Sequence, residues 1–205
     1  ASVPLGTGLA FAHKYRGDGG LNFCYFGDGA ANQGQVYEAF NMASLWKLPI
    51  IYVIENNRYA MGTSLQRASA TTELYRRGEA FGIPGMPVDG MDVLAVKKAG
   101  EEVTAHVRAG NGPYVMELNT YRYRGHSMSD PAKYRSKEEV SQVRKESDPI
   151  DMLRAYILEH ALSDEAAFKE IDREVKDIVN EAAEFAQSSP EPDPAELWTD
   201  VLIEA

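Results

Sequence analysis

Two short apolar runs, each followed by a polar loop sequence, constrain the fold of this chain more than any other feature. The first run, Leu21–Phe26, leads into Gly27-Asp28-Gly29, and the second, Ile50–Ile54, is followed closely by Asn56-Asn57. Runs of this length next to glycine and asparagine predict buried β-strands. Asp28 and Asn57 therefore each follow the carboxyl end of a predicted strand, 29 positions apart.

The segment between the two runs is predicted to be helical. Apolar residues recur at a helical period in Gln35–Trp46, so strand, helix and strand form one βαβ unit with parallel strands. Open α/β sheets bind ligands at the carboxyl ends of their strands. A carboxylate and an amide carbonyl are hard oxygen donors, so Asp28 and Asn57 suit Mg²⁺ held against a phosphate. Each residue taken alone is also a common turn former.

The rest of the chain continues to alternate strand and helix signals. Strands are predicted around Pro87–Val88 and over Tyr114–Asn119, and loops over Tyr59–Thr72 and Tyr121–Tyr134. Helices are predicted over Thr72–Ala80, from an Asp92 N-cap to Arg108, after the capping box Ser136–Glu139, after Asp148-Pro149 and after Ser163. This alternation favours an α/β fold with a doubly wound, mostly parallel sheet.

Length and composition limit the class of protein. For 205 residues we expect a single domain over residues 1–205, with C-terminal helices from about residue 148 and a docking tail from about residue 190. A net charge of −10 without a basic stripe argues against nucleic acid and anionic membrane surfaces as partners. No apolar run approaches the ~20 residues of a membrane span. The single cysteine, Cys24, lies mid-strand as a core residue and suits a reducing compartment.

Three blocks in fixed order carry a family resemblance. Phe26–Gln35, Glu55–Thr63 and Thr120–Pro131 resemble the alpha subunits of the pyruvate dehydrogenase family, the decarboxylating component of the 2-oxo-acid dehydrogenase complexes, and the resemblance runs from Ala1 to about Pro194. It implies a thiamine diphosphate-binding fold, with thiamine diphosphate and Mg²⁺ as cofactors. It implies oxidative decarboxylation of pyruvate, a small 2-oxo acid, with reductive acetylation of a lipoyl group. It also implies two partners: a beta subunit, in a heterotetramer of two alpha and two beta chains, and a lipoyl-bearing acetyltransferase component.

The resemblance assigns roles to individual residues. It implies that Asp28, Asn57 and the backbone carbonyl of Tyr59 bind the metal, and that Gly29 and Ala30 contact the diphosphate. His126 is the catalytic candidate, near the diphosphate and the reacting end of the cofactor, where it assists proton transfer or orients the lipoyl substrate.

Other residues near these blocks leave alternatives open. Arg122 and Arg124 pair either with phosphate or with acidic residues of the chain. Glu38 follows the metal loop, but the glutamate that activates the cofactor belongs to the beta subunit in this family, so Glu38 is expected to make a helix or interface contact.

The resemblance also has limits. Branched-chain 2-oxo acids and acetoin are rival substrates, and a cofactor-binding or assembly fragment without activity is a rival of another class. Ser64 and Ser127 correspond to regulatory phosphorylation sites of mitochondrial relatives, but Lys133 replaces a third such serine. That departure favours a bacterial, cytoplasmic form over a mitochondrial matrix one. The first residues, Ala1–Ala12, lack an initiator Met and have the pattern of a packed element, so the chain is expected to be a fragment, a cleaved product or an incompletely resolved subunit.

Overall fold

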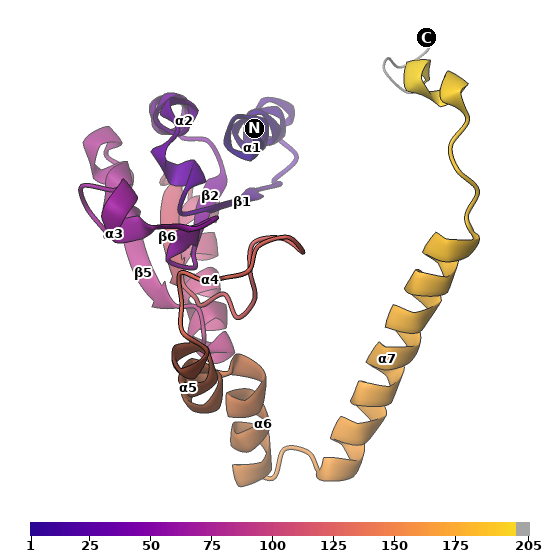
Figure 1. Ribbon diagram of the computed structural model, residues 1–205. Helices are drawn as coiled ribbons and strands as arrows, with labels where there is room; N and C mark the ends of the chain where they lie inside the picture. Colours follow the sequence, from indigo (N-terminus) through magenta and orange to yellow (C-terminus); the bar gives the residue numbers. More distant parts are fainter. Residues whose placement is uncertain (200–205) are drawn as a thin grey trace. The chain divides into compact units, whose positions relative to one another are not determined.

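The first of two compact units is built on a parallel sheet. The computed structural model describes residues 1–199, and the chain divides into the units Ala1–Leu153 and Arg154–Ala205. Within the first unit, four strands pair in the order β1-β2-β6-β5, and every pairing is parallel (Figure 1). Their bounds are Asn22–Gly27 for β1, Ile50–Asn56 for β2, Gly85–Asp89 for β5 and Tyr114–Asn119 for β6. The predicted α/β class with a parallel sheet is confirmed.

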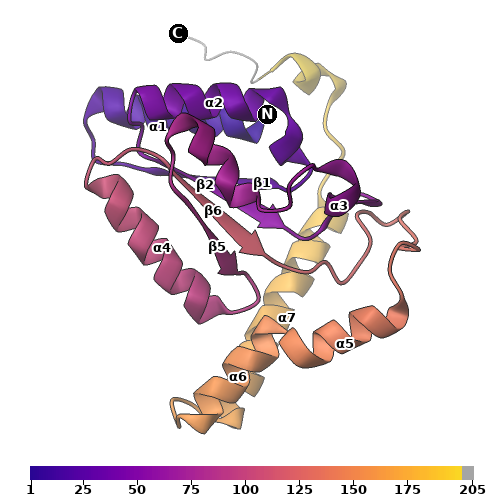
Figure 2. The same cartoon turned by 90° about the vertical axis from the view of Figure 1, so that its left-hand side faces the viewer.

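Helices cover both faces of this sheet. Helices α1 (Ser2–Arg16) and α2 (Gly34–Leu45) lie on one face with the 3₁₀ helix η2 (Leu74–Phe81), and α4 (Val93–Arg108) lies on the other (Figure 2). Side chains of a strand alternate between faces, so β2 divides its residues between the two cores. Tyr52 and its alternate neighbours join the α1–α2 side, while Ile51 and Val53 join the α4 side. Burial on both faces explains why β2 is almost continuously apolar.

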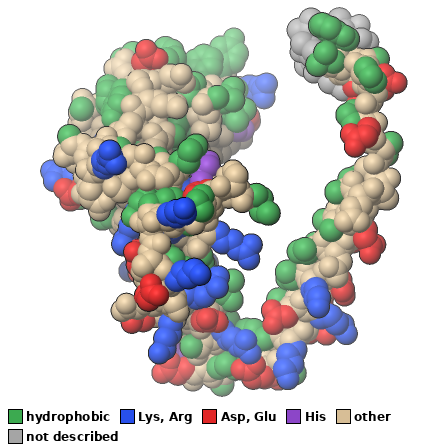
Figure 3. All heavy atoms as spheres, in the orientation of Figure 1, with side chains coloured by type: hydrophobic (Ala, Val, Ile, Leu, Met, Phe, Trp, Pro, Cys, Tyr) green, Lys and Arg blue, Asp and Glu red, His purple; other side chains and the backbone are tan. Residues whose placement is uncertain are grey.

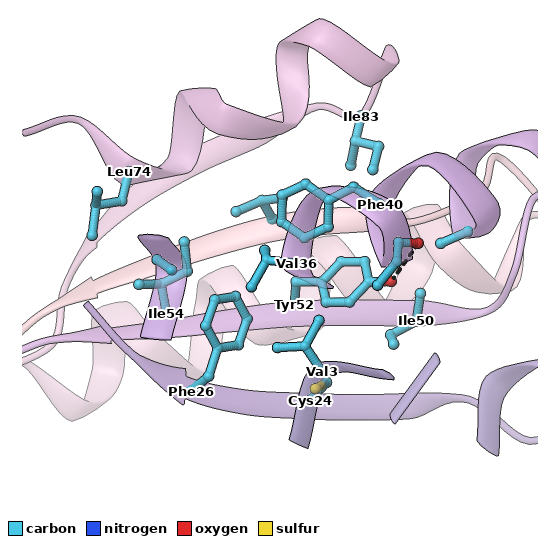
Figure 4. Packing of buried hydrophobic residues seen from close by; sticks show 14 of the residues in the cluster. Val3, Cys24, Phe26, Val36, Phe40, Ile50, Tyr52, Ile54, Leu74 and Ile83 are labelled. Carbon is cyan, nitrogen blue, oxygen red and sulfur yellow. Dashed lines mark hydrogen bonds between the residues drawn. The ribbon is translucent and has the colours of Figure 1, made fainter. Parts of the chain in front are cut away.

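The core beneath α1 and α2 is centred on aromatic rings. Phe40 and Tyr52 are both fully buried, with ring centroids 4.6 Å apart (Figure 4). The Tyr52 hydroxyl lies 2.8 Å from the Thr7 hydroxyl, so the buried polar atom has a partner. Cys24 is buried as predicted, and an added Cβ at Gly6 would lie 2.7 Å from its sulfur. The small residue Gly6 of α1 therefore allows a close approach to β1.

The helix starts follow their predicted capping residues. Asp92 accepts hydrogen bonds from two backbone N–H groups of α4, and Ser136 accepts one from Glu139 at the start of α5 (Lys137–Ser147). The capping box is only half formed, because the Glu139 carboxylate accepts from the Tyr121 hydroxyl at 2.7 Å. Asp148 caps α6 (Pro149–Glu159) through the Ile150 N–H.

Two predictions between β2 and β5 need correction. The predicted loop Tyr59–Thr72 contains an antiparallel hairpin, β3 (Tyr59–Ala60) with β4 (Thr63–Ser64), followed by the short helix α3 (Leu65–Ala68). Strands of two residues are too short to show a hydrophobic period, so the sequence pattern missed them. The predicted helix Thr72–Ala80 is the 3₁₀ helix η2 at Leu74–Phe81.

The second unit consists mainly of one long helix, α7 (Glu165–Ser188), capped by Asp164. No residue of α7 is buried, and its apolar stripe is 53–73% exposed at Ile171, Val175, Ile178, Val179 and Phe185. Figure 3 shows hydrophobic side chains along this helix. A 3₁₀ turn, η3 (Pro194–Trp198), follows. The predicted tail Leu197–Ile203 lies partly outside the described residues, and the single-domain expectation stays a prediction. Over residues 1–199 no helix combines the length and the apolar character of a membrane span.

Candidate functional site

The segments that carry Asp28 and Asn57 lie side by side because β1 and β2 are adjacent strands. Gly27 pairs in parallel register with Glu55, so the residues that follow them leave the same edge of the sheet side by side. Asp28 follows β1 directly, and Asn57 follows β2. An added Cβ at Gly29 would lie 2.5 Å from the Ala60 Cβ, so the loop after β1 presses on the hairpin after β2.

Asp28 is a buried carboxyl group at this junction. Its residue is 2% exposed, and burial raises its pKa above the ordinary range. Its own backbone N–H, the Arg122 guanidinium and the Asn57 N–H each lower that pKa in part. No salt bridge to Asp28 is formed by any residue in the range 1–199, and Arg122 Nη1 has no hydrogen-bond partner there either. A buried carboxylate with such partial compensation suits an added cation.

The contact between the Asn57 amide and the Tyr59 carbonyl can be compared with the spacing of metal ligands. With its nitrogen toward Tyr59, the amide donates to the Tyr59 carbonyl oxygen at 2.8 Å, and its oxygen accepts from Arg122 Nη2 at 3.1 Å. With the oxygen and nitrogen exchanged, two oxygens face each other at the same 2.8 Å and the amide nitrogen faces the Arg122 Nη2 donor, so both contacts are repulsive. Adjacent ligands of an octahedral Mg²⁺ lie about 3 Å apart, because each Mg–O distance is about 2.1 Å. The 2.8 Å spacing of the Asn57 amide and the Tyr59 carbonyl oxygen therefore matches that of neighbouring Mg²⁺ ligands, provided that the Asn57 oxygen turns from Arg122 toward the ion.

The hydrogen bonds around Asn56 hold this loop, and sequence reasoning missed them. Asn56 Oδ1 accepts from the Arg58 N–H at 3.1 Å, and Asn56 Nδ2 donates to Glu117 Oε1 at 2.7 Å. Glu117 Oε2 accepts from the Tyr75 N–H at 2.9 Å. Glu117 is 2% exposed. A glutamate inside the otherwise apolar strand Tyr114–Asn119 was the available signal.

The predicted diphosphate contacts lie at the first turn after β1. Gly29 has φ −66°, an ordinary helical value, so it is not needed for a left-handed turn. The close approach of Ala60 is what excludes a side chain at Gly29. Ala30 begins the 3₁₀ helix η1 (Ala30–Asn32), which directly precedes α2. Both residues lie beside Asp28, as the spacing required.

His126 lies on an exposed loop that is organised by Asp130. The Asp130 carboxylate accepts from the His126 N–H at 2.7 Å, the Ala132 N–H at 2.9 Å and the Tyr134 hydroxyl at 2.8 Å. These bonds lower the pKa of Asp130. The His126 imidazole makes no hydrogen bond within residues 1–199, and the structure does not place it in contact with Asp28 or Asn57. Its catalytic role remains a prediction.

A buried arginine joins the His126 loop to the metal loop. Arg135 is 8% exposed, and its guanidinium carbon lies 5.1–5.6 Å from the ring centroids of Tyr59, Tyr121 and Tyr134. Its Nη2 donates to the Arg124 carbonyl at 2.9 Å. Cation–π contact with the Tyr59 ring links Tyr59, whose carbonyl is a predicted metal donor, to the neighbouring loop.

Among the remaining candidates, Glu38, Arg124 and Ser127 are exposed, while Ser64 and Arg122 are half-buried. Glu38 is exposed on α2, and its side chain forms no ion pair or hydrogen bond in the described part of the chain. Ser127 is exposed and contacts the Ser129 hydroxyl at 3.1 Å, while Ser64 ends the β3–β4 hairpin. Neither Arg122 nor Arg124 joins a salt bridge within residues 1–199, so the internal pairing considered for them is not seen.

Two further observations bear on the metal. Within residues 1–199 no three His, Cys, Asp or Glu side chains are grouped to hold an ion. The predicted donors are one carboxylate, one amide and one backbone carbonyl, so they fall outside such groupings. A cavity of about 530 Å³ lies at the carboxyl ends of β5 and β6, lined in part by Asp89 and Asn119, and Asp28 and Asn57 do not line it.

The fold and the site define an α/β protein with oxygen donors at the carboxyl edge of a parallel sheet. The Dehydrogenase E1 component family matches residues 1–195, and the chain belongs to this family. The pyruvate dehydrogenase E1 component subunit alpha of Rhizobium meliloti (strain 1021) is 62% identical over 203 residues, which are 99% of this chain and 58% of the relative. The subunit of the same name from Zymomonas mobilis is 57% identical over 203 residues, 99% of this chain and 57% of the relative.

A mitochondrial relative shows the same partial coverage. The somatic, mitochondrial pyruvate dehydrogenase E1 component subunit alpha of Bos taurus is 52% identical over 198 residues, 96% of this chain and 50% of the relative. The chain thus spans between 50% and 58% of the length of these three relatives.

Proposed function

We propose that this chain is the part of a pyruvate dehydrogenase alpha subunit that anchors Mg²⁺ and the diphosphate of thiamine diphosphate. The observation that carries the proposal is the 2.8 Å approach of the Asn57 amide to the Tyr59 carbonyl beside the buried Asp28. The names of the relatives support the particular enzyme, since those from Rhizobium meliloti, Zymomonas mobilis and Bos taurus are all pyruvate dehydrogenase subunits.

Each residue of the site has a distinct task in this proposal. Asp28 supplies the negative charge for the ion, and Asn57 and Tyr59 supply neutral oxygens. Arg122, with an Nη1 that lacks a partner within residues 1–199, is available for a phosphate oxygen. Gly29 and Ala30 offer backbone N–H groups at the first turn after β1. When bound, thiamine diphosphate stabilises the carbanion that forms as the 2-oxo acid loses carbon dioxide.

His126 is the proposed catalytic residue of the part of the site that this chain supplies. It lies on the exposed loop that Asp130 organises and Arg135 ties to Tyr59. An imidazole there holds or moves a proton near neutral pH, or orients the lipoyl group. A phosphate on Ser127 would place negative charge next to His126 and oppose an anionic cofactor. Ser64 and Ser127 are simple loop hydroxyls in a bacterial form.

A beta subunit is the proposed partner. The relatives are named as alpha subunits, and α7 carries an apolar stripe that no described residue buries. Contiguous exposed apolar surface marks interaction sites. We infer that this stripe packs in the heterotetramer, that the beta subunit supplies the activating glutamate, and that the lipoyl-bearing acetyltransferase component is the acceptor. The single cysteine suits the bacterial cytoplasm or the mitochondrial matrix. Acetoin and branched-chain 2-oxo acids remain the alternative substrates.

Calorimetry on the full-length alpha subunit, with and without its beta partner, tests the metal assignment. Asp28→Asn keeps the shape of the side chain and removes its charge, so we expect Mg²⁺ and thiamine diphosphate to bind at least about 100-fold more weakly. Glu38→Gln is the matched control, because it removes one exposed carboxylate from the adjacent helix and should leave binding unchanged. Unchanged binding by Asp28→Asn would refute the proposal, and a panel of 2-oxo acids assayed with the assembled enzyme would identify the substrate.

A further inference from the structure

We propose that Glu117 is a positioning residue for the metal-binding loop, and that it acts through Asn56. This inference rests on the proposed metal site, and it assigns a role to a buried carboxylate two strand positions away from the sheet edge. Glu117 contacts no metal-binding atom itself. It fixes the side chain of Asn56, which in turn fixes the backbone turn between the two donors Asn57 and Tyr59.

The first link is the buried pair Glu117–Asn56. The two residues are 2% and 4% exposed, and Asn56 Nδ2 lies 2.7 Å from Glu117 Oε1. The second carboxylate oxygen is taken by the Tyr75 N–H at 2.9 Å, at the start of η2. Glu117 thus receives one strong donor on each oxygen, which fixes its orientation between β2 and η2.

The second link runs from Asn56 to the metal donors. With its nitrogen held by Glu117, Asn56 turns its Oδ1 toward the Arg58 N–H, which lies 3.1 Å away. Arg58 has φ 71°, a left-handed conformation that is unfavourable for a residue with a side chain. This turn is what brings the Tyr59 carbonyl back to within 2.8 Å of the Asn57 amide. The Asn56 backbone is held separately, since its carbonyl accepts from the Thr120 N–H at 2.8 Å.

A carboxylate is required because both contacts of Glu117 are donors. A glutamine at this position has one acceptor and one NH₂ group, so it faces one of the two donors with another donor. Leaving one member of a buried hydrogen-bond network without a partner lowers the stability of the fold. Exchanging donors for acceptors throughout the network, so that every bond is kept, lowers it much less. Exchanging the carboxylate and the amide between positions 117 and 56 therefore separates the effect of the hydrogen bonds from the effect of the charge.

The exchange is Asn56→Asp combined with Glu117→Gln. In the double variant, the introduced glutamine donates to one oxygen of the introduced aspartate and accepts from the Tyr75 N–H. The other oxygen of that aspartate accepts from the Arg58 N–H. Every bond is restored, and the total charge is that of the natural chain. Asn56→Asp alone sets two carboxylates face to face, and Glu117→Gln alone sets two donors face to face.

The experiment titrates Mg²⁺ at fixed thiamine diphosphate into the metal-free, full-length enzyme with its beta subunit, followed by calorimetry. Glu117→Gln should raise the Mg²⁺ dissociation constant by about 10- to 100-fold, as loss of outer contacts to a metal ligand does. Asn56→Asp should raise it at least as much, and the double variant should return to within about threefold of the natural enzyme. Tighter Mg²⁺ binding by Asn56→Asp alone would mean that charge, rather than position, governs this loop, and would overturn the inference.

Melting temperatures of the metal-free proteins provide the structural control. Tyr52→Phe removes a buried hydroxyl from β2, the strand that contains Asn56. It should lower the melting temperature and leave the Mg²⁺ dissociation constant unchanged. If Glu117→Gln behaves as Tyr52→Phe does, Glu117 only stabilises the fold and the inference is wrong. Failure of the proposed function has a different result: Asp28→Asn would then bind Mg²⁺ as tightly as the natural enzyme, whatever Glu117 does.

Discussion

The unit Ala1–Leu153 and the described part of the second unit, Arg154–Thr199, use apolar residues in opposite ways. Phe40 in the first is fully buried, whereas Phe185 in the second is 73% exposed. All 17 glycines of the chain precede residue 126, so they all belong to the first unit. The comparison teaches that the first unit is specified by its own packing. In the second unit, α7 has the apolar period of a packed helix, but no residue within 1–199 buries its apolar stripe.

The largest expected effect comes from truncating the same residue type in each unit. Phe40→Ala removes a ring that packs on Tyr52 in the core, so the free energy of unfolding should fall by about 3–5 kcal/mol. Phe185→Ala should change it by less than about 0.5 kcal/mol in the absence of a partner. Urea unfolding of the 205-residue chain, followed by circular dichroism, measures both. Equal losses would show that Phe185 is buried and would end the contrast.

A second test compares Gly27, the last residue of β1, with Gly29 in the loop that follows it. Gly29→Ala should weaken Mg²⁺ and thiamine diphosphate binding by about 10- to 100-fold, because its Cβ would lie 2.5 Å from the Ala60 Cβ and separate the two loops. Gly27→Ala is the control, since an added Cβ there meets nothing within 4 Å. Calorimetry on the assembled enzyme gives both affinities, and similar losses for both variants would argue against the contact with Ala60.

The exposed stripe of α7 provides the third test. Ile178→Asp should weaken association with the beta subunit by about tenfold or more, since a charge buried in an apolar interface is unfavourable. Asn180→Asp adds the same charge about 200° around the helix, and should have little effect. Sedimentation of alpha and beta mixtures measures the assembly. If both variants assemble normally, the stripe is not the interface, and the second unit has another use.

The smallest expected effect is a pH dependence of stability caused by burial of the Cys24 thiol in the first unit. Burial raises the pKa of the Cys24 thiol from its ordinary 9.0 to about 11. The unfolded chain therefore loses this proton first, and native stability should fall as the pH rises from 9 to 11, by at most about 1.4 kcal/mol per pH unit. Between pH 8 and pH 10 the natural chain should lose about 1 kcal/mol more than Cys24→Ala. Parallel urea midpoints for the two proteins would contradict the shift.

Much of the candidate site at the carboxyl ends of β1 and β2 was predictable from the sequence because it depends on local signals. Asp28 and Asn57 each follow a strand whose apolar run is visible in the sequence, and parallel strands bring their carboxyl ends together. The capping residues Asp92, Ser136 and Asp148 were likewise predicted, since a cap is a contact over two or three positions. Element boundaries differed by one or two residues, because helix and strand ends depend on neighbouring elements.

The missed features are those that join distant segments. The hairpin Tyr59–Ser64 is too short to have a period, and its place against Gly29 depends on how β1 and β2 pair. Glu117 lies 61 positions from Asn56 along the chain, so no local pattern links them. Arg135 shows the same limit, since its contact with the Tyr59 ring joins segments 76 positions apart.

The sequence by itself therefore determined the α/β class, the order of the elements and the identity of the candidate metal donors. The class, the element order and the donors Asp28 and Asn57 follow from hydrophobic period, turn chemistry and motif spacing, which act over a few residues. The Tyr59 carbonyl came from the family resemblance. Tertiary structure alone decided that the loop at Gly29 meets Ala60, that Glu117 holds Asn56, and that α7 remains uncovered over residues 1–199. Hydrogen bonds and burial depend on which segments meet in space, and that is settled only when the whole sheet is assembled.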